Sequence, residues 1–96
     1  MITGKQRSYL KGLANSIEPI IQIGKSGLTQ NIITQIDEAL EARELIKIKL
    51  LDTSLLDAKE TANEICAELN AEYVQSIGSK FVLYRQSKKN KTIQLP

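Results

Sequence analysis

The sequence predicts an α/β protein, specifically a two-layer α+β fold in which helices pack on a mixed four-stranded sheet. Segments with apolar residues every three or four positions alternate with short segments in which every second residue is apolar. The resulting order is α-β-α-β-α-β-β. Ninety-six residues, of which 42% are apolar, suffice for a single core. We therefore expect one domain, residues 1–96, ending in a basic tail at residues 86–96.

The first helix is expected near residues 4–15. Thr3 precedes it as a plausible N-cap, and apolar residues then recur at helical spacing at Leu10, Leu13, Ala14 and Ile17. Pro19 helps to end this helix, because proline disfavours helical angles in the residue before it. A short strand, Ile20–Ile23, follows and stops at Gly24.

A second helix is predicted from Thr29 to Ala42, with Leu28 placed to pack on its first turn. The next strand, Glu44–Leu51, alternates strictly, because apolar Ile46, Ile48 and Leu50 are interleaved with Lys47 and Lys49. Period-two alternation predicts that one face of this strand meets the core and that the other meets water or a ligand.

A third helix is expected from about Leu56 to Leu69, followed by strands Tyr73–Ile77 and Phe81–Arg85. A three-residue loop containing glycine, residues 78–80, joins these strands as a hairpin. Right-handed crossovers make the first three strands parallel, and the hairpin adds an antiparallel strand. Acidic residues fall at helical spacings typical of solvated faces, namely Glu38, Glu41, Glu60, Glu64 and Glu68.

The net charge of +2 conceals an uneven distribution of charged residues. Residues 1–30 carry four basic residues and one acidic residue, residues 31–76 carry four and ten, and residues 77–96 carry five and none. If the two chain ends meet, they form a basic face opposite an acidic one. Such a face is the electrostatic footprint of a nucleic-acid binder, although a dipolar, well-solvated surface without a partner has the same charge pattern.

Catalysis finds little support in the composition. The chain has no histidine, and its one cysteine, Cys66, lies on the apolar stripe of the third helix. No Cys/His cluster could hold zinc, so we expect no enzyme activity, metal, cofactor or small-molecule substrate. The longest apolar run, Phe81–Tyr84, is too short to span a membrane. The lone cysteine and the lack of a secretory signal favour a cytoplasmic protein.

The most informative motif is Gly24-Lys25-Ser26-Gly27, between the first strand and the second helix. Glycines allow close approach of a partner, the start of the helix offers unpaired N–H groups, and Lys25 adds a cation. These features suit a phosphate, although the glycines could simply permit a tight turn. A nucleotide-binding P-loop is excluded because Pro19 stands where its first glycine belongs. RNA-binding KH modules clamp nucleotides with a similar Gly-x-x-Gly loop.

Other basic residues are candidates for the same surface. Lys47 and Lys49 share one side of the strand that follows, although alternating lysines could also just keep that strand soluble. Tyr84 could stack on a base or belong to the core. The charge pattern adds six further candidate RNA contacts, namely Lys5, Arg7, Lys11, Arg85, Lys88 and Lys89.

A series of segments in order gives a more specific signal than the glycine pair. The core of the series is Pro19–Thr29 and Glu44–Lys49, accompanied by Lys11-Gly12-Leu13, Ile36, Ala39-Leu40, Ile77-Gly78 and Leu83-Tyr84-Arg85. With these segments the chain resembles the CRM (chloroplast RNA splicing and ribosome maturation) domain family, in particular its single-domain bacterial YhbY-like members. The resemblance extends from Leu10 to Arg85.

The resemblance implies a fold similar to the C-terminal domain of translation initiation factor three. It also implies RNA binding through Gly24–Gly27 and the adjoining basic surface, without catalysis. Bacterial members are associated with precursors of the large ribosomal subunit, so the expected partner is ribosomal RNA and the expected role is maturation of that subunit. The alternative is a protein–protein adaptor on ribosomal particles that uses the acidic middle segment. The oligomeric state stays open.

Overall fold

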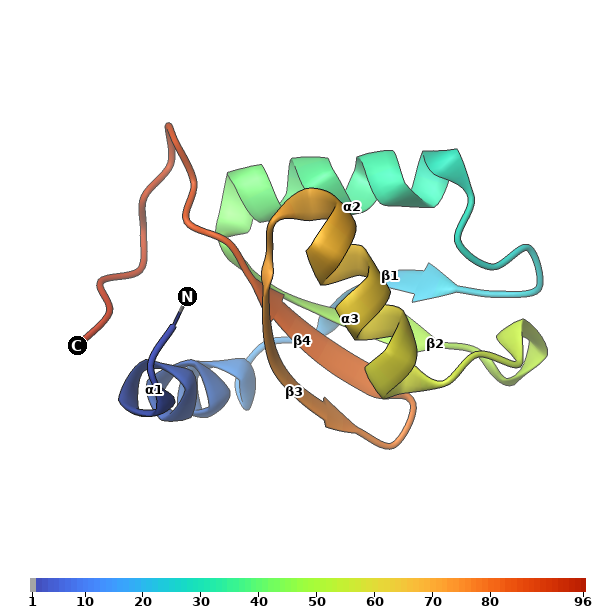
Figure 1. Ribbon diagram of the computed structural model, residues 1–96, viewed down its shortest axis with the longest axis horizontal. Helices are drawn as coiled ribbons and strands as arrows, with labels where there is room; N and C mark the ends of the chain where they lie inside the picture. Colours follow the sequence, from blue (N-terminus) through green and yellow to red (C-terminus); the bar gives the residue numbers. More distant parts are fainter. Residues whose placement is uncertain (1) are drawn as a thin grey trace.

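The computed structural model describes residues 2–96, in which helices cover both faces of a four-stranded sheet (Figure 1). The sheet has the order β1-β2-β4-β3, with β1 parallel to β2 and β4 antiparallel to both β2 and β3. The predicted element order and mixed sheet are confirmed. The elements are α1 (Gly4–Ala14), β1 (Pro19–Ile23), α2 (Gln30–Arg43), β2 (Leu45–Leu50), the 3₁₀ turn η1 (Asp52–Ser54), α3 (Ala58–Leu69), β3 (Glu72–Ile77) and β4 (Lys80–Tyr84).

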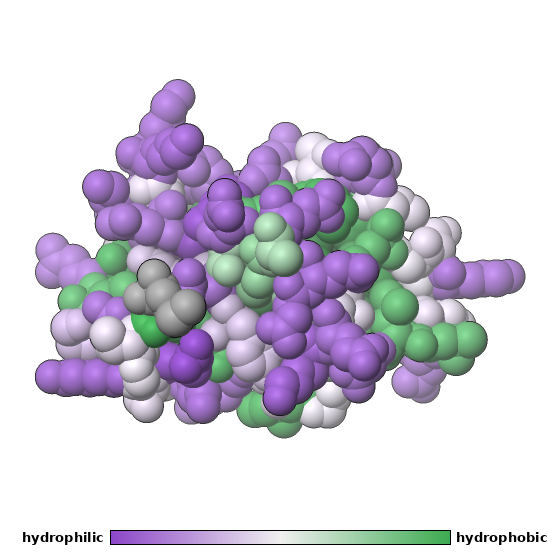
Figure 2. All heavy atoms as spheres, viewed as in Figure 1, coloured by the Kyte–Doolittle hydropathy of each residue, from purple (hydrophilic) through white to green (hydrophobic). Residues whose placement is uncertain are grey.

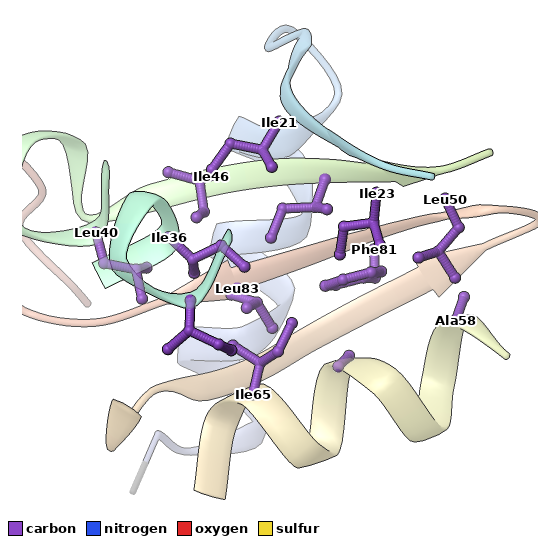
Figure 3. Close-up of a cluster of buried hydrophobic side chains, with 13 residues drawn as sticks. Ile21, Ile23, Ile36, Leu40, Ile46, Leu50, Ala58, Ile65, Phe81 and Leu83 are labelled. Carbon is purple, nitrogen blue, oxygen red and sulfur yellow. The ribbon is translucent and has the colours of Figure 1, made fainter. Parts of the chain in front are cut away.

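The alternation of β2 divides the interior into two cores. Its isoleucines face α2 and α3, and Figure 3 shows Ile36, Ile65 and Phe81 among the side chains that meet there. On the opposite face, Leu45 packs with Leu10 and other residues of a smaller core beneath α1. The helix α1 therefore forms a partial third layer in addition to the two expected from the sequence.

Side-chain caps set the helix boundaries. The Oγ1 atom of Thr3 accepts a hydrogen bond from the Gln6 N–H, and the Gln6 side chain accepts one from the Thr3 N–H, which forms a capping box. The Asp57 carboxylate accepts a hydrogen bond from the Glu60 N–H at 2.9 Å. Because Asp57 is this cap, α3 begins at Ala58, later than the position expected from periodicity.

The β3–β4 hairpin is tighter than the sequence predicts. Ile77 pairs with Lys80, which leaves only Gly78 and Ser79 in the loop. Gly78 has a φ of 58°, a value that glycine adopts without the steric cost of a side chain. Lys80 is consequently the first residue of β4 and has a fixed partner on each side.

The C-terminal tail, residues 86–96, packs on the domain without forming a helix or strand. Ile93 and Leu95 pack against the core beneath α1, and the Gln6 side chain donates a hydrogen bond to the Pro96 carbonyl oxygen at 3.2 Å. The two chain ends thus meet, which was the condition for a basic face formed by both ends. They meet at the end of the molecule opposite the segment that joins β1 to α2 (Figure 1).

Two carboxylates hold this tail through its backbone. Glu44 is fully buried and accepts hydrogen bonds from the N–H groups of Ser87 (2.7 Å), Thr92 (2.7 Å) and Ile93 (2.9 Å). Glu41 accepts hydrogen bonds from the Ser87 hydroxyl and from the next two backbone N–H groups. The helical spacing placed Glu41 on a solvated face, but it lies against the tail because the chain folds back over the end of α2.

The hydrogen bonds of Glu44 also determine its ionisation. Burial acts to raise its pKa, because the charged form loses hydration. The bonds from Ser87, Ile93 and Thr92 stabilise the charged form and outweigh burial, so that the pKa of Glu44 is lowered. The folded protein therefore favours the ionised carboxylate more than the unfolded chain does.

Replacing Glu44 by Gln should destabilise the fold by about 2–3 kcal/mol at pH 7, because charge-assisted hydrogen bonds are lost at a buried site. The contribution of Glu44 to stability is fully present above its unfolded pKa of about 4.3, and it disappears as the pH falls through the lower folded pKa. Urea unfolding between pH 7 and 3 measures both effects. The exposed Glu38→Gln is the control, and equal stability of the two variants at pH 7 would contradict this role.

Candidate functional site

Gly24, Lys25, Ser26 and Gly27 form a hydrogen-bonded β-turn. The Gly27 N–H donates to the Gly24 carbonyl oxygen at 3.0 Å, and both central side chains are exposed. Gly27 has a φ of 69°, which disfavours residues with a side chain, whereas a Cβ atom at Gly24 would make only ordinary contacts. The turn therefore favours glycine at position 27, and its tip is open to a partner.

Backbone donors at this tip are available to an anion. No atom of residues 2–96 accepts a hydrogen bond from the N–H of Lys25 or Ser26. The helix α2 begins three residues after the turn, and there the Thr29 hydroxyl accepts a hydrogen bond from the Ile32 N–H at 3.2 Å. The free N–H groups and Lys25 are thus followed, within five residues, by the positive end of α2.

Beside the turn, part of the sheet has no helix over it. The helix α1 covers the end of the sheet where Leu45 and Tyr84 lie and stops short of the other end. We call the uncovered part the open sheet face, and it consists of Ile20, Gln22, Lys47, Lys49, Gln75, Ile77 and Lys80. One row across it, Gln22–Lys49–Lys80–Ile77, crosses all four strands just before the turn.

Lys49 and Lys80 lie directly opposite each other in this row. Cβ atoms at such positions are about 4.5–5.5 Å apart, and like charges there repel. The single ion pair within residues 2–96 joins Arg85 to Asp37, so no carboxylate offsets this repulsion through an ion pair. Together with Lys47 and Lys25, the two lysines give the open sheet face and the adjoining turn the character of an anion-binding surface.

Lys80 is not among the basic residues that the sequence suggests as RNA contacts, although its position makes it a candidate. The sequence-based prediction placed Lys80 in the hairpin loop, whereas the structure places it in β4, opposite Lys49. Strand register depends on the length of the turn, which a single sequence gives only approximately. The glycine at position 78 was the available signal, because a glycine at the first central position suits a two-residue turn.

The basic residues of α1 lie on the same side of the sheet. Lys11 is exposed and lies one turn before Asn15, which borders the open sheet face beside Lys47. Lys5 is exposed at the far end of this helix. The Arg7 Nε donates a hydrogen bond to the Tyr73 carbonyl oxygen at 3.2 Å, so this guanidinium is partly engaged in linking α1 to β3.

The structure does not bring the C-terminal candidates to the turn. The Arg85 guanidinium binds the Asp37 carboxylate at 2.7 Å and also the Leu69 carbonyl oxygen at 3.0 Å. Lys88 and Lys89 lie where the tail meets Glu41, near the C-terminal end of α2. The 14 residues of α2 span about 21 Å. This distance exceeds the Debye length of about 8 Å at physiological ionic strength.

Charge is separated by the sheet. The helices α2 and α3, on one side, carry six acidic residues, Asp37, Glu38, Glu41, Glu60, Glu64 and Glu68, against two basic ones, Arg43 and Lys59. Figure 2 shows hydrophilic side chains over much of α3. The other side carries the lysines of the open sheet face and of α1, which outnumber its two carboxylates, Glu18 near Lys47 and Glu72 beside Ile2. A basic face opposite an acidic one is therefore present, but it arises from the two sides of the sheet and not from the union of the chain ends.

The described residues offer little for catalysis. Cys66 is half-buried, and burial, assisted by the charge of Glu72, raises its thiol pKa to about 11, so that it is protonated at neutral pH. Tyr84 is buried beneath α1, so of its two predicted roles the structure supports the one in the core. Within residues 2–96, no three His, Cys, Asp or Glu side chains gather as a metal site would require, and no helix is long and apolar enough to cross a membrane.

Comparison with known proteins gives a consistent result. The model of the CRS1/YhbY (CRM) domain matches residues 2–85. YqeI of Bacillus subtilis (strain 168), named as a probable RNA-binding protein, is 46% identical over the full length of both chains. An RNA-binding protein of Haemophilus influenzae is 40% identical, covering 99% of this chain and 95% of the relative. The solution structure of the hypothetical protein SAV1595 from Staphylococcus aureus has a TM-score of 0.80 and 49% identity, with full coverage of both chains.

Replacing Lys80 by Gln should stabilise the fold by a few tenths of a kcal/mol at low salt, because it removes the repulsion with Lys49. Thermal unfolding at low and at high salt measures the effect, and added salt should reduce the difference between variant and wild type. Lys59→Gln, on the exposed surface of α3, is the control. A Lys80→Gln variant less stable than wild type would show that the two charges are compensated.

Proposed function

This chain belongs to the CRS1/YhbY (CRM) domain family, and we propose that it is a non-catalytic RNA-binding protein that assists maturation of the large ribosomal subunit. Its proposed ligand is ribosomal RNA in precursor particles. The family supports the class of ligand, because several relatives are named as RNA-binding proteins. The ribosomal assignment rests on the resemblance to YhbY-like proteins.

The proposal depends mainly on how the turn follows the sheet register. Gln22 in β1 pairs with Lys49, Lys49 pairs with Lys80, and the turn with its two free N–H groups and exposed lysine begins two residues after Gln22. Two opposed ammonium groups without an ion-pair partner lower stability, and a bound polyanion removes that cost. RNA, with one phosphate per nucleotide, offers regularly spaced negative charges to such a row.

In the proposed complex the turn and the open sheet face have different roles. N–H groups at the tip of the Gly24–Gly27 turn hold one phosphate oxygen, as N–H groups at helix starts and nests do. Lys25, Lys49 and Lys80 then neutralise that phosphate and its neighbours. Each neutralised phosphate releases counterions, so the binding constant should fall steeply with salt.

The acidic helices α2 and α3 face away from this surface. They are the part of the chain on which the alternative adaptor function would depend. Like charge makes them unsuitable for RNA, so in our proposal they orient the domain by repelling the ligand from the wrong side.

Changing Lys25 to Ala should weaken RNA binding and reduce the slope of log K against log[salt] by about 0.7–0.9, the value for one phosphate contact. Titration of a labelled ribosomal RNA fragment at several salt concentrations gives the slope. Lys59→Ala removes an exposed lysine from α3 and should leave the slope unchanged. An unaltered slope for Lys25→Ala would remove Lys25 from the interface.

Gly27→Asp should reduce RNA affinity about tenfold or more, because it adds a negative charge where a phosphate would lie. Asp tolerates positive φ better than most residues, and no atom lies within 4 Å of a Cβ at this position, so the variant should fold. Gly27→Asn has the same shape without the charge and should lose less. Wild-type affinity of folded Gly27→Asp would rule out the turn as a contact.

A further inference from the structure

A small hollow lies on the open sheet face beside the C-terminal end of α1. Its volume is about 180 Å³, equivalent to roughly six water molecules at about 30 Å³ each. It is lined by Asn15, Lys47, Gln75, Ile77, Lys80 and Val82. The hollow exists because α1 ends at Ala14, so the sheet beyond that point has no helix above it.

The sheet register explains this lining. Val82 in β4 pairs with Lys47 on one side and with Gln75 on the other, and its buried side chain forms the floor. The neighbouring row contributes Lys80 and Ile77, the latter 66% exposed. An apolar floor is therefore surrounded by four polar side chains and by Ile77.

Two unused amide groups give this hollow its chemical character. Within residues 2–96, neither the Asn15 nor the Gln75 side chain makes a hydrogen bond. An amide side chain offers both donors and an acceptor, which is the combination that recognises the edge of a nucleobase. The apolar floor suits the flat face of a ring, and the flanking lysines suit the phosphates on either side of it.

We propose that this hollow receives one unpaired base of a single-stranded RNA whose backbone lies across Lys49 and Lys80 to the Gly24–Gly27 turn. This inference rests on the proposed RNA binding. Lys80 borders the hollow and pairs with Lys49, which pairs with Gln22 close to the turn. At about 4.8 Å between strands, this path measures roughly 10–15 Å, a span of a few nucleotides.

The proposal selects single-stranded over double-stranded RNA. In an A-form duplex the bases are stacked and paired, and the deep major groove is closed to side chains. A base can enter the hollow only if it is unpaired and turned out of the stack. The ligand should therefore be a loop, a bulge or a single-stranded segment.

The test uses the full chain and a 12-nucleotide ribosomal RNA fragment, single-stranded or annealed to its complement. Single-stranded RNA should bind at least about tenfold more tightly than the duplex. Removing the bases one at a time as abasic sites should reveal one position whose loss weakens binding about five- to tenfold, the effect of a base-edge contact. In Gln75→Ala, the penalty at that position should largely disappear.

The matched control is Gln35→Ala, an exposed glutamine on α2, which should keep the full abasic penalty. Equal affinity for single strand and duplex, or an abasic penalty that Gln75→Ala leaves unchanged, would overturn the base-binding hollow alone. In that case Lys25→Ala and Gly27→Asp would still weaken binding. Failure of every RNA to bind would overturn the proposed function itself.

Discussion

The alternation along β2 is the constraint on which the rest of the structure depends. This strand pairs with β1 on one side and β4 on the other, so the direction of its side chains sets the two faces of the sheet. One face of the strand packs in the core beneath α2 and α3 through Ile46, Ile48 and Leu50. A slip of one residue would send Lys47 and Lys49 into that core, where unpaired charges are very costly.

The same alternation explains how one small domain carries two opposite electrostatic surfaces. A sheet covered fully on both faces would have to bury its lysines, but α1 covers only the end near Leu45. The rest of that face can therefore carry Lys47, Lys49 and Lys80 while the other face remains fully packed. The proposed site thus occupies the part of the sheet that the core does not need.

The sequence identified most of the fold because periodicity and caps are local signals. Strand β2, helix α2 and the turn at Gly27 could all be inferred from residues within one window. Contacts between segments far apart in the sequence could not be inferred in this way. The pairing of Lys80 with Lys49 depends on the register of the hairpin. The hydrogen bond from the Thr92 N–H to the Glu44 carboxylate depends on where the tail packs. The tail residues Lys88 and Lys89 were predicted to join the site because the net charge of a segment does not show where that segment lies in the fold.

The anchoring of the tail explains why the charge of each segment did not predict where the tail lysines lie. Glu44 adopts a φ of 66°, an uncommon conformation for a residue other than glycine, and its buried carboxylate accepts three backbone N–H groups of the tail. Those bonds involve the main chain, so they hold the tail regardless of its lysine side chains. The tail lysines are therefore placed by a structural requirement at the end of α2. Lys49 and Lys80, by contrast, lie directly opposite each other, and we expect their repulsion to lower stability, as is common where a binding surface and stability compete.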